Sequence, residues 1–209
     1  MKNKISYILI LLLVILTSFN SKPATGCLEL DLILIGDYSS SLRGQEHYFV
    51  GACRTFVKKF QLSEQTIKIG IVTFNDTAKL ISPLSSDTSF ITSRINELAE
   101  EIGEDWTNME KGLFVAFNEF TNNGRPNAQK MIIILSDGAV NDPGDKTSAP
   151  ITTMEIIQQL RMTGMGVCSI LIKSGEEEPE FMKAISSGCY AESSYENLAI
   201  ELAKLDVCL

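Results

Sequence analysis

Short runs of isoleucine, leucine and valine recur along the chain and are separated by longer segments with a different apolar period. The runs cover residues 28–35, 67–74, 131–135 and 167–172, and apolar side chains dominate them. Runs of this length and composition are typical of strands that are buried on both faces of a parallel sheet. A shorter run at 79–81 follows Asn75-Asp76 and predicts an edge strand that forms a hairpin with its predecessor.

The segments between these runs have the period of amphipathic helices. In residues 45–60, apolar side chains from Phe49 to Phe60 return every three or four positions and fall on one helical face. Similar patterns predict helices at 89–102, 109–120, 152–162, 179–185 and 194–205. Strands that alternate with helices predict an α/β fold with a doubly wound, mostly parallel sheet, one antiparallel edge strand and helices on both faces. Ligands of such sheets bind beyond the carboxyl ends of the strands.

The composition limits the domain count and the partners. The chain has 209 residues, of which 44% are hydrophobic and 21% charged, so one globular domain with a sizeable core is expected. Its formal net charge is -8, and its longest basic run is Lys58-Lys59. Because nucleic-acid binding depends on clustered lysine and arginine, nucleic acid is not an expected partner. An acidic chain is compatible with a site for a cation.

The beginning of the chain has the order of a secretory signal. Two lysines precede an apolar run at residues 5–16, and a polar stretch then ends in the small residues Ala24-Thr25-Gly26. We therefore expect residues 1–26 to be a signal peptide and residues 27–209 to be a secreted or cell-surface domain. The apolar run is short for a membrane span and no second one follows, so no span is expected in the mature chain.

Two alternatives remain for this leader. One is a signal anchor that stays uncleaved. The other is a bacterial lipoprotein signal, in which Cys27 would carry the lipid anchor. Against the lipoprotein, ten residues separate Leu16 from Cys27, and Ala24 stands where such a signal usually has leucine.

Polar residues follow two of the predicted strands. The segment after the first strand reads Asp37-Tyr38-Ser39-Ser40-Ser41, and the segment after 131–135 reads Ser136-Asp137-Gly138. Both carboxylates leave the carboxyl ends of central strands, where the hydroxyls of Ser39 and Ser41 can face one ion. Thr107, at the start of a predicted helix, can add a third hydroxyl. A hard cation such as Mg²⁺ prefers six oxygen ligands, and neutral hydroxyls leave most of its charge uncancelled.

These elements resemble the metal-ion-dependent adhesion site of von Willebrand factor A-type, or integrin I-like, domains. That site consists of D-x-S-x-S, a distant threonine and an aspartate in a D-G turn, in the order found here, and the resemblance covers nearly all of residues 27–209. It implies a divalent cation, Mg²⁺ or else Mn²⁺ or Ca²⁺, bound by Asp37, Ser39, Ser41, Thr107 and Asp137. One departure is Glu104-Asp105-Trp106, where a glycine-rich turn often precedes the threonine.

The resemblance implies an adhesion or protein-binding module. In the family, the aspartates often act through water, and an open position on the ion receives a glutamate or aspartate of an extracellular partner protein. Tyr38 and Trp106 are candidates for the surface around that ligand, although both are also typical of packed loop residues. Taken alone, D-x-S-x-S is typical of a turn after a strand. The alternative function is a metal-independent scaffold subunit of an extracellular assembly.

An enzyme is not the expected function. His47 is the only histidine and lies at the start of a predicted helix, and no G-x-S-x-G motif is present. The nearest enzymatic alternative is a Mg²⁺-dependent aspartyl phosphotransferase, in which Asp37 would accept the phosphate. Such enzymes carry a second acid two residues later, where this chain has Ser39, so the general acid would be missing.

The five cysteines allow two disulfides and leave one thiol. Cys27 precedes the first strand and Cys208 follows the last helix, positions that are neighbours in the family's fold and are bridged in some members. Cys168 lies in a predicted strand and Cys189 in the expected neighbouring edge strand, so a second bridge is expected. Cys53 lies on the apolar face of the first helix and is expected to be buried. Five reduced thiols are the alternative.

The cysteine pattern also resembles that of apicomplexan surface adhesins that carry this domain. In I-like domains, the last helix can shift along the sheet as the metal loop rearranges, and by resemblance this helix is the one predicted at 194–205. A bridge between Cys27 and Cys208 would tether its end and limit such a shift.

Overall fold

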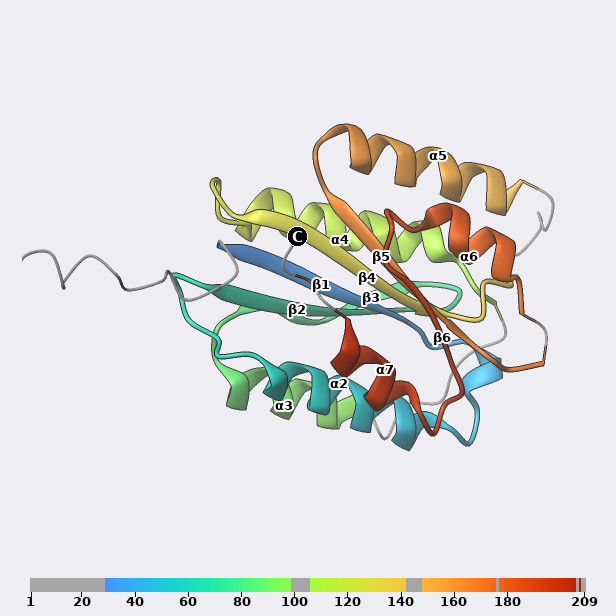
Figure 1. Cartoon of the computed structure of the whole chain (residues 1–209), viewed down its shortest axis with the longest axis horizontal. Helices are drawn as coiled ribbons and strands as arrows, with labels where there is room; N and C mark the ends of the chain where they lie inside the picture. Colours follow the sequence, from blue (N-terminus) through green and yellow to red (C-terminus); the bar gives the residue numbers. More distant parts are fainter. Residues whose placement is uncertain (1–28, 99–105, 142–147, 176, 206, 208–209) are drawn as a thin grey trace, which may run out of the picture.

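In the computed structural model, which describes residues 29–98, 106–141, 148–175, 177–205 and 207, a twisted sheet lies between two layers of helices (Figure 1). The sheet has six strands in the order β3-β2-β1-β4-β5-β6, and all neighbours pair in parallel except β2 and β3. This confirms the predicted fold class, including the antiparallel edge strand. The strands are β1 (Leu30–Asp37), β2 (Ile67–Phe74), β3 (Ala78–Ser85), β4 (Gln129–Ser136), β5 (Gly166–Ile172) and β6 (Tyr190–Ser193).

The helices divide between the two faces of the sheet, and each set encloses its own apolar core (Figure 1). One face is covered by α2 (Glu46–Lys59), α3 (Thr88–Glu97) and α7 (Leu198–Lys204). The other is covered by α4 (Met109–Asn123), α5 (Ala149–Met162) and α6 (Pro179–Ile185). A short 3₁₀ helix, η1 (Ser40–Leu42), follows β1.

Strand β1 lies at the centre of the molecule. All eight of its residues are buried, and successive side chains alternate between the two cores because the strand period is two. Leu32 and Leu34 belong to the core under α2, and Ile33 and Ile35 to the core under α4. Burial of each such side chain stabilises the fold by about 1.5–3 kcal/mol. The carboxyl end of β1 is therefore held firmly between the strands on either side.

The last residue before Asp37 has to be glycine for a steric reason. A Cβ atom built on Gly36 would lie 2.0 Å from Cζ of Phe49, whose ring packs there from α2. Any side chain at Gly36 would push α2 away from this end of the sheet. The close approach of Phe49 therefore helps to fix the position of the loop that follows β1.

At the opposite end of the sheet, Arg125 joins the amino ends of β1 and β2. Its backbone N–H and its Nε donate to the two carboxylate oxygens of Asp31, at 2.6 and 2.8 Å. Its Nη2 donates to the carbonyls of Leu30 and Thr66, at 2.7 and 3.0 Å, and its Nη1 to the carbonyl of Glu64, at 2.9 Å. Asp31 is fully buried. The guanidinium thus neutralises a buried charge and donates hydrogen bonds to three backbone carbonyls at or just before the amino ends of these strands.

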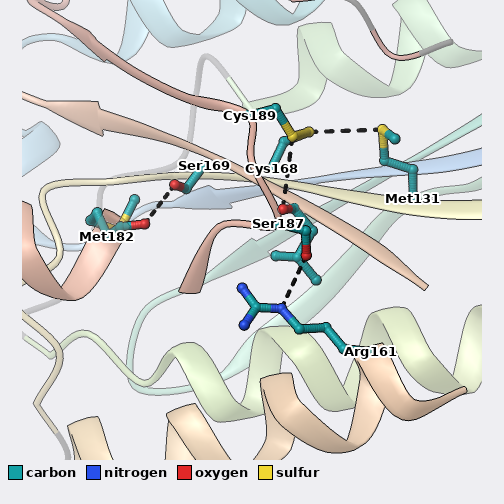
Figure 2. Close-up of a disulfide and its surroundings, with 8 residues drawn as sticks. Met131, Arg161, Cys168, Ser169, Met182, Ser187 and Cys189 are labelled. Atoms are coloured by element: carbon teal, nitrogen blue, oxygen red, sulfur yellow. Dashed lines mark hydrogen bonds between the residues drawn. A yellow bond between two sulfur atoms is a disulfide. The ribbon is translucent and has the colours of Figure 1, made fainter. Parts of the chain in front are cut away.

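A disulfide between Cys168 and Cys189 joins β5 to the segment that enters β6 (Figure 2). Their Cα atoms are 4.9 Å apart, and Sδ of Met131 on β4 lies 3.9 Å from Sγ of Cys168. Next to the bridge, Nε of Arg161 donates to the hydroxyl of Ser187 at 3.0 Å (Figure 2). The structure therefore contains the bridge expected between these two cysteines, and it secures the short edge strand.

Other expectations for the cysteines and the leader have different outcomes. Cys53 is a free, fully buried thiol in the core under α2, as expected. The proposed bridge between Cys27 and Cys208 and the proposed signal peptide at 1–26 lie outside the described residues. Among the residues that are described, no helix is both long and apolar enough to span a membrane.

Two element boundaries differ from the sequence prediction for local reasons. The last helix begins at Leu198 and not at residue 194, because a turn comes first in which the N–H of Asn197 bonds the Ser194 carbonyl. Strand β3 extends to Ser85, beyond the predicted 79–81. Its later part is held by Glu119 of α4, whose Oε1 accepts the N–H of Leu84 at 2.8 Å.

Candidate functional site

The loop after β1 brings one carboxylate and two hydroxyls together. Oδ1 of Asp37 accepts the backbone N–H of Ser39 at 3.1 Å, and the hydroxyl oxygens of Ser39 and Ser41 are 3.2 Å apart. Asp37 and Ser39 are buried, whereas Ser41 is exposed. The D-x-S-x-S segment therefore folds back on itself and reaches the surface at Ser41.

The second carboxylate of the cluster leaves β4. Oδ1 of Asp137 accepts the N–H of Ala139 at 3.1 Å, and its Oδ2 accepts the hydroxyl of Ser174 at 2.9 Å. Gly138 has a φ of +84°, a backbone conformation that a side chain would strain, so glycine after the aspartate is a requirement of this turn. The carboxylate of Asp137 is thereby held at both oxygens.

Ser136 connects Asp37 to the turn that contains Asp137 and Gly138, and sequence reasoning did not single it out. Its hydroxyl donates to Oδ2 of Asp37 at 2.6 Å and accepts the N–H of Gly138 at 3.0 Å. This contact follows from the sheet register, because Gly36 of β1 pairs with Leu135 of β4 and the next residues on the two strands are neighbours. In the sequence, the signal for the contact between Ser136 and Asp37 is the serine that precedes Asp137 in the S-D-G segment.

Thr107 is joined to the loop that follows Asp137. Its N–H donates to the backbone and side-chain oxygens of Asn141, at 3.3 and 3.1 Å, and its carbonyl accepts the N–H of Asn141 at 3.1 Å. The next residue, Asn108, caps α4 by accepting the N–H of Lys111 and donates its own N–H to the carbonyl of Asn75, just after β2. Thr107 is thus fixed, buried, at the same edge of the sheet.

The two carboxylates of the cluster, Asp37 and Asp137, favour a positive charge beside them. Burial, and next the charge of Asp137, raise the pKa of Asp37 from 3.8 to about 7, against the opposing effect of the hydrogen bonds from Ser136 and Ser39. In the described part of the chain, no lysine or arginine forms an ion pair with either aspartate. Two buried carboxylates that repel each other without a counter-ion are costly to keep ionised.

Tyr195 is a second residue that sequence reasoning missed. It lies in the turn between β6 and α7, is 9% exposed, and its hydroxyl lies near the side chain of Ser41. Burial raises the pKa of this phenol, and the charges of Asp37 and Asp137 act in the same direction. No sequence motif marks this tyrosine, because its role depends on how the end of β6 lies beside the first loop.

The two residues predicted to surround a ligand differ in their placement. Tyr38 is 2% exposed, its hydroxyl donates to the carbonyl of Leu98 at 2.5 Å, and its ring packs edge-on against Phe49. Tyr38 is therefore packed in the core, with little of its side chain at the surface. Trp106 is partly exposed next to Thr107, and its backbone N–H donates to Oδ1 of Asp76 at 3.2 Å.

The donor set fits a hard divalent cation. Two carboxylates and neighbouring hydroxyls offer only oxygen, which Mg²⁺ and Mn²⁺ accept, and the unbalanced negative charge favours a cation. No group of three or more histidine, cysteine or acidic side chains suited to a metal occurs among the described residues. A cation here would therefore rely on hydroxyls and water for its other ligands, which leaves it strongly electrophilic.

The fold and this cluster define a doubly wound α/β domain with acidic and hydroxyl groups at the carboxyl edge of its central strands. A sequence model of the von Willebrand factor type A domain matches residues 31–202. The chain therefore belongs to the von Willebrand factor type A domain family. Domains of this family are generally non-enzymatic adhesion or protein-binding modules and often bind a divalent metal.

Solved structures share the fold at low sequence identity. The von Willebrand factor domain of the type V pili tip protein Mfa5 from Porphyromonas gingivalis has a TM-score of 0.70 at 15% identity, over 84% of this chain and 93% of that chain. Manganese-loaded TRAP protein of Plasmodium vivax has a TM-score of 0.69 at 17% identity, over 84% and 73%. Proximal thread matrix protein 1 of the mussel byssus has a TM-score of 0.69 at 23% identity, over 86% and 47%.

Proposed function

We propose that this chain is an extracellular protein-binding module that holds one divalent cation and uses it to bind an acidic side chain of a partner protein. Asp37, Ser39, Ser41, Thr107 and Asp137 would hold the cation, with Mg²⁺ as the expected ion and Mn²⁺ or Ca²⁺ as substitutes. The cation would supply a Lewis-acidic position for the partner's carboxylate. We also propose that the module is secreted or displayed at the cell surface after removal of residues 1–26.

One observation carries this proposal. The buried carboxylates of Asp37 and Asp137 come from the ends of neighbouring strands and have no lysine or arginine ion partner in the described residues. Burial, and next the charge of Asp137, raise the pKa of Asp37 to about 7. A bound cation would offset both effects, which supports a cation at this position.

The chain's own residues would prepare this binding position. The Asp37 carboxylate accepts the backbone N–H of Ser39 and the hydroxyl of Ser136, and the Asp137 carboxylate accepts the hydroxyl of Ser174. The exposed Ser41 marks the side from which a ligand can approach. Trp106, partly exposed beside Thr107, is the remaining candidate for the ligand surface.

The test compares two serines of one loop. Ser39→Ala removes a proposed ligand, whereas Ser40→Ala removes a hydroxyl that lies between the two motif serines and has no proposed role. Calorimetric titration of the purified protein with Mg²⁺ and with Mn²⁺ is expected to detect binding by the wild type and by Ser40→Ala, and a strongly weakened signal for Ser39→Ala. Binding by all three proteins with equal affinity would remove the cluster as the cation site.

A second measurement tests the partner. Immobilised protein is incubated with native extracellular material in Mg²⁺ and in chelator, and the captured proteins are identified by mass spectrometry. We expect a partner that is lost in chelator and with Ser39→Ala. Capture that is unaffected by both changes would instead favour the metal-independent scaffold; a thread matrix protein of the mussel byssus shares the fold.

A further inference from the structure

Both carboxylates of the cluster are held in the same manner. In Asp37 and in Asp137, Oδ1 accepts the backbone N–H of the residue two positions later, at 3.1 Å in each case. In both, Oδ2 accepts a serine hydroxyl from another strand end, which is Ser136 for Asp37, at 2.6 Å, and Ser174 for Asp137, at 2.9 Å. Ser136 is the last residue of β4, and Ser174 follows β5. Neither serine belongs to the motif elements that mark the site in the sequence.

We propose that Ser136 and Ser174 are positioning residues of the cation site, which orient the two carboxylates and so set the affinity of the site for the ion. The inference rests on the proposed function, since it concerns the same cation. Neither serine needs to touch the ion. Each acts through the aspartate that accepts its hydroxyl.

The geometry around Ser136 leaves its hydroxyl a single orientation. The hydroxyl donates to Asp37 and accepts the N–H of Gly138 at 3.0 Å, so both of its functions are in use. Ser136 is fully buried, and water therefore does not replace either contact. Because Oδ1 and Oδ2 of Asp37 are both engaged, the plane of the carboxylate is fixed about its Cβ–Cγ bond.

This orientation matters because the two carboxylates repel each other. Without the hydroxyl of Ser136, Oδ2 of Asp37 loses its donor, and the carboxylate is free to turn away from Asp137. Mg²⁺ demands near-octahedral geometry with short, uniform distances, so a site with mobile carboxylates binds it less well. Loss of a hydrogen-bond partner of a metal-site residue typically lowers metal affinity by roughly 10- to 100-fold.

The neighbouring strand supplies a matched control. Ser169 of β5 is also fully buried, and its hydroxyl donates to the carbonyl of Met182 at 2.7 Å (Figure 2). Ser169→Ala therefore removes a buried strand hydroxyl and its one hydrogen bond, which is not to an aspartate, whereas Ser136→Ala removes a buried strand hydroxyl and two hydrogen bonds, one of them to Asp37. A loss of cation binding that came only from removing a buried hydroxyl would be seen in both variants.

The experiment measures the affinity of the full chain for Mg²⁺ and for Mn²⁺ by calorimetry, with the melting temperature recorded for each variant. We expect Ser136→Ala to weaken binding by roughly 10- to 100-fold, Ser174→Ala to weaken it by less because water can replace an exposed hydroxyl, and Ser169→Ala to keep wild-type affinity. Ser174 is exposed, so Ser174→Ala is expected to keep the wild-type melting temperature. Ser136→Thr keeps the hydroxyl and is expected to bind more tightly than Ser136→Ala.

Several results would overturn the positioning role. The first is wild-type affinity in both Ser136→Ala and Ser174→Ala. The second is a loss of affinity in Ser169→Ala that equals the loss in Ser136→Ala. The third is a Ser136→Thr protein that has the wild-type melting temperature but binds the cation as weakly as Ser136→Ala. If the wild type binds neither Mg²⁺ nor Mn²⁺, the proposed cation site fails and the positioning role fails with it. If the wild type binds and the serine variants bind equally well, only the positioning role fails.

Discussion

The raised pKa of Asp37 predicts how the stability of the metal-free protein depends on pH. Burial, and next the charge of Asp137, raise this pKa from 3.8 to about 7. Between these two pH values the folded protein holds more protons than the unfolded chain. The contribution of Asp37 to the free energy of unfolding should therefore fall as the pH rises from about 4 to about 7 and then level off.

The size of the effect follows from the same values. The difference between 3.8 and about 7 corresponds to on the order of 4 kcal/mol of stability lost when Asp37 is fully ionised. Asp37→Asn removes this charge with little change in shape, but it weakens one hydrogen bond worth about 1 kcal/mol. We expect the variant to be about 1 kcal/mol less stable than the wild type near pH 4 and about 3 kcal/mol more stable at pH 8.

Urea denaturation in chelator, followed by circular dichroism at pH 4, 6 and 8, measures this crossover. Asp87→Asn is the control, because Asp87 is exposed and caps α3, a role that asparagine fills equally well. With Mg²⁺ in excess, the order at pH 8 should reverse, since only the wild type keeps both carboxylates for the ion. A wild-type stability that rises with pH relative to Asp37→Asn in chelator would refute the reasoning.

Three further predictions concern the rest of the fold. Arg125→Met leaves Asp31 buried without its counter-ion and should lower the free energy of unfolding by about 3–5 kcal/mol in urea titrations. Cys189→Ala removes the bridge to Cys168, which spans a sequence separation of 21 residues, and should cost about 3 kcal/mol, with no further loss on adding reductant. Burial raises the pKa of the Cys53 thiol to about 12, so iodoacetamide at pH 8 should label Cys53 in urea but not in the folded protein, as read by peptide mass mapping.

The sequence predicts those parts of the fold in which the chemistry of each residue determines whether it is buried or exposed. Residues 32–35 and 131–135 are apolar because both faces of those strands are covered, and that requirement is visible in a single sequence. The order of D-x-S-x-S, threonine and D-G was visible for a similar reason, since each element follows a strand or starts a helix. The cluster at the sheet edge follows from the parallel arrangement itself.

The remaining features of the site depend on register and on packing. Ser136 contacts Asp37 only because β1 and β4 pair in the register that sets Gly36 against Leu135. Tyr38 stands between two motif residues in the sequence, yet its ring turns into the core, because its backbone bonds the end of β2 and its hydroxyl bonds the Leu98 carbonyl. Neither outcome has a local sequence signal, since the partner lies far along the chain.

The last helix illustrates how such long-range contacts bear on control of the site. At one end of this segment, the hydroxyl of Tyr195 lies near the side chain of Ser41, in the loop proposed to hold the cation. At the other end, the carbonyl of Leu205 accepts the Nζ of Lys59 of α2 at 2.6 Å. A shift of α7 along the sheet would break both contacts, whatever the state of Cys27 and Cys208. We therefore expect any movement of this helix to disturb the contact between Tyr195 and Ser41, and the bond to Lys59 to oppose the movement independently of any disulfide.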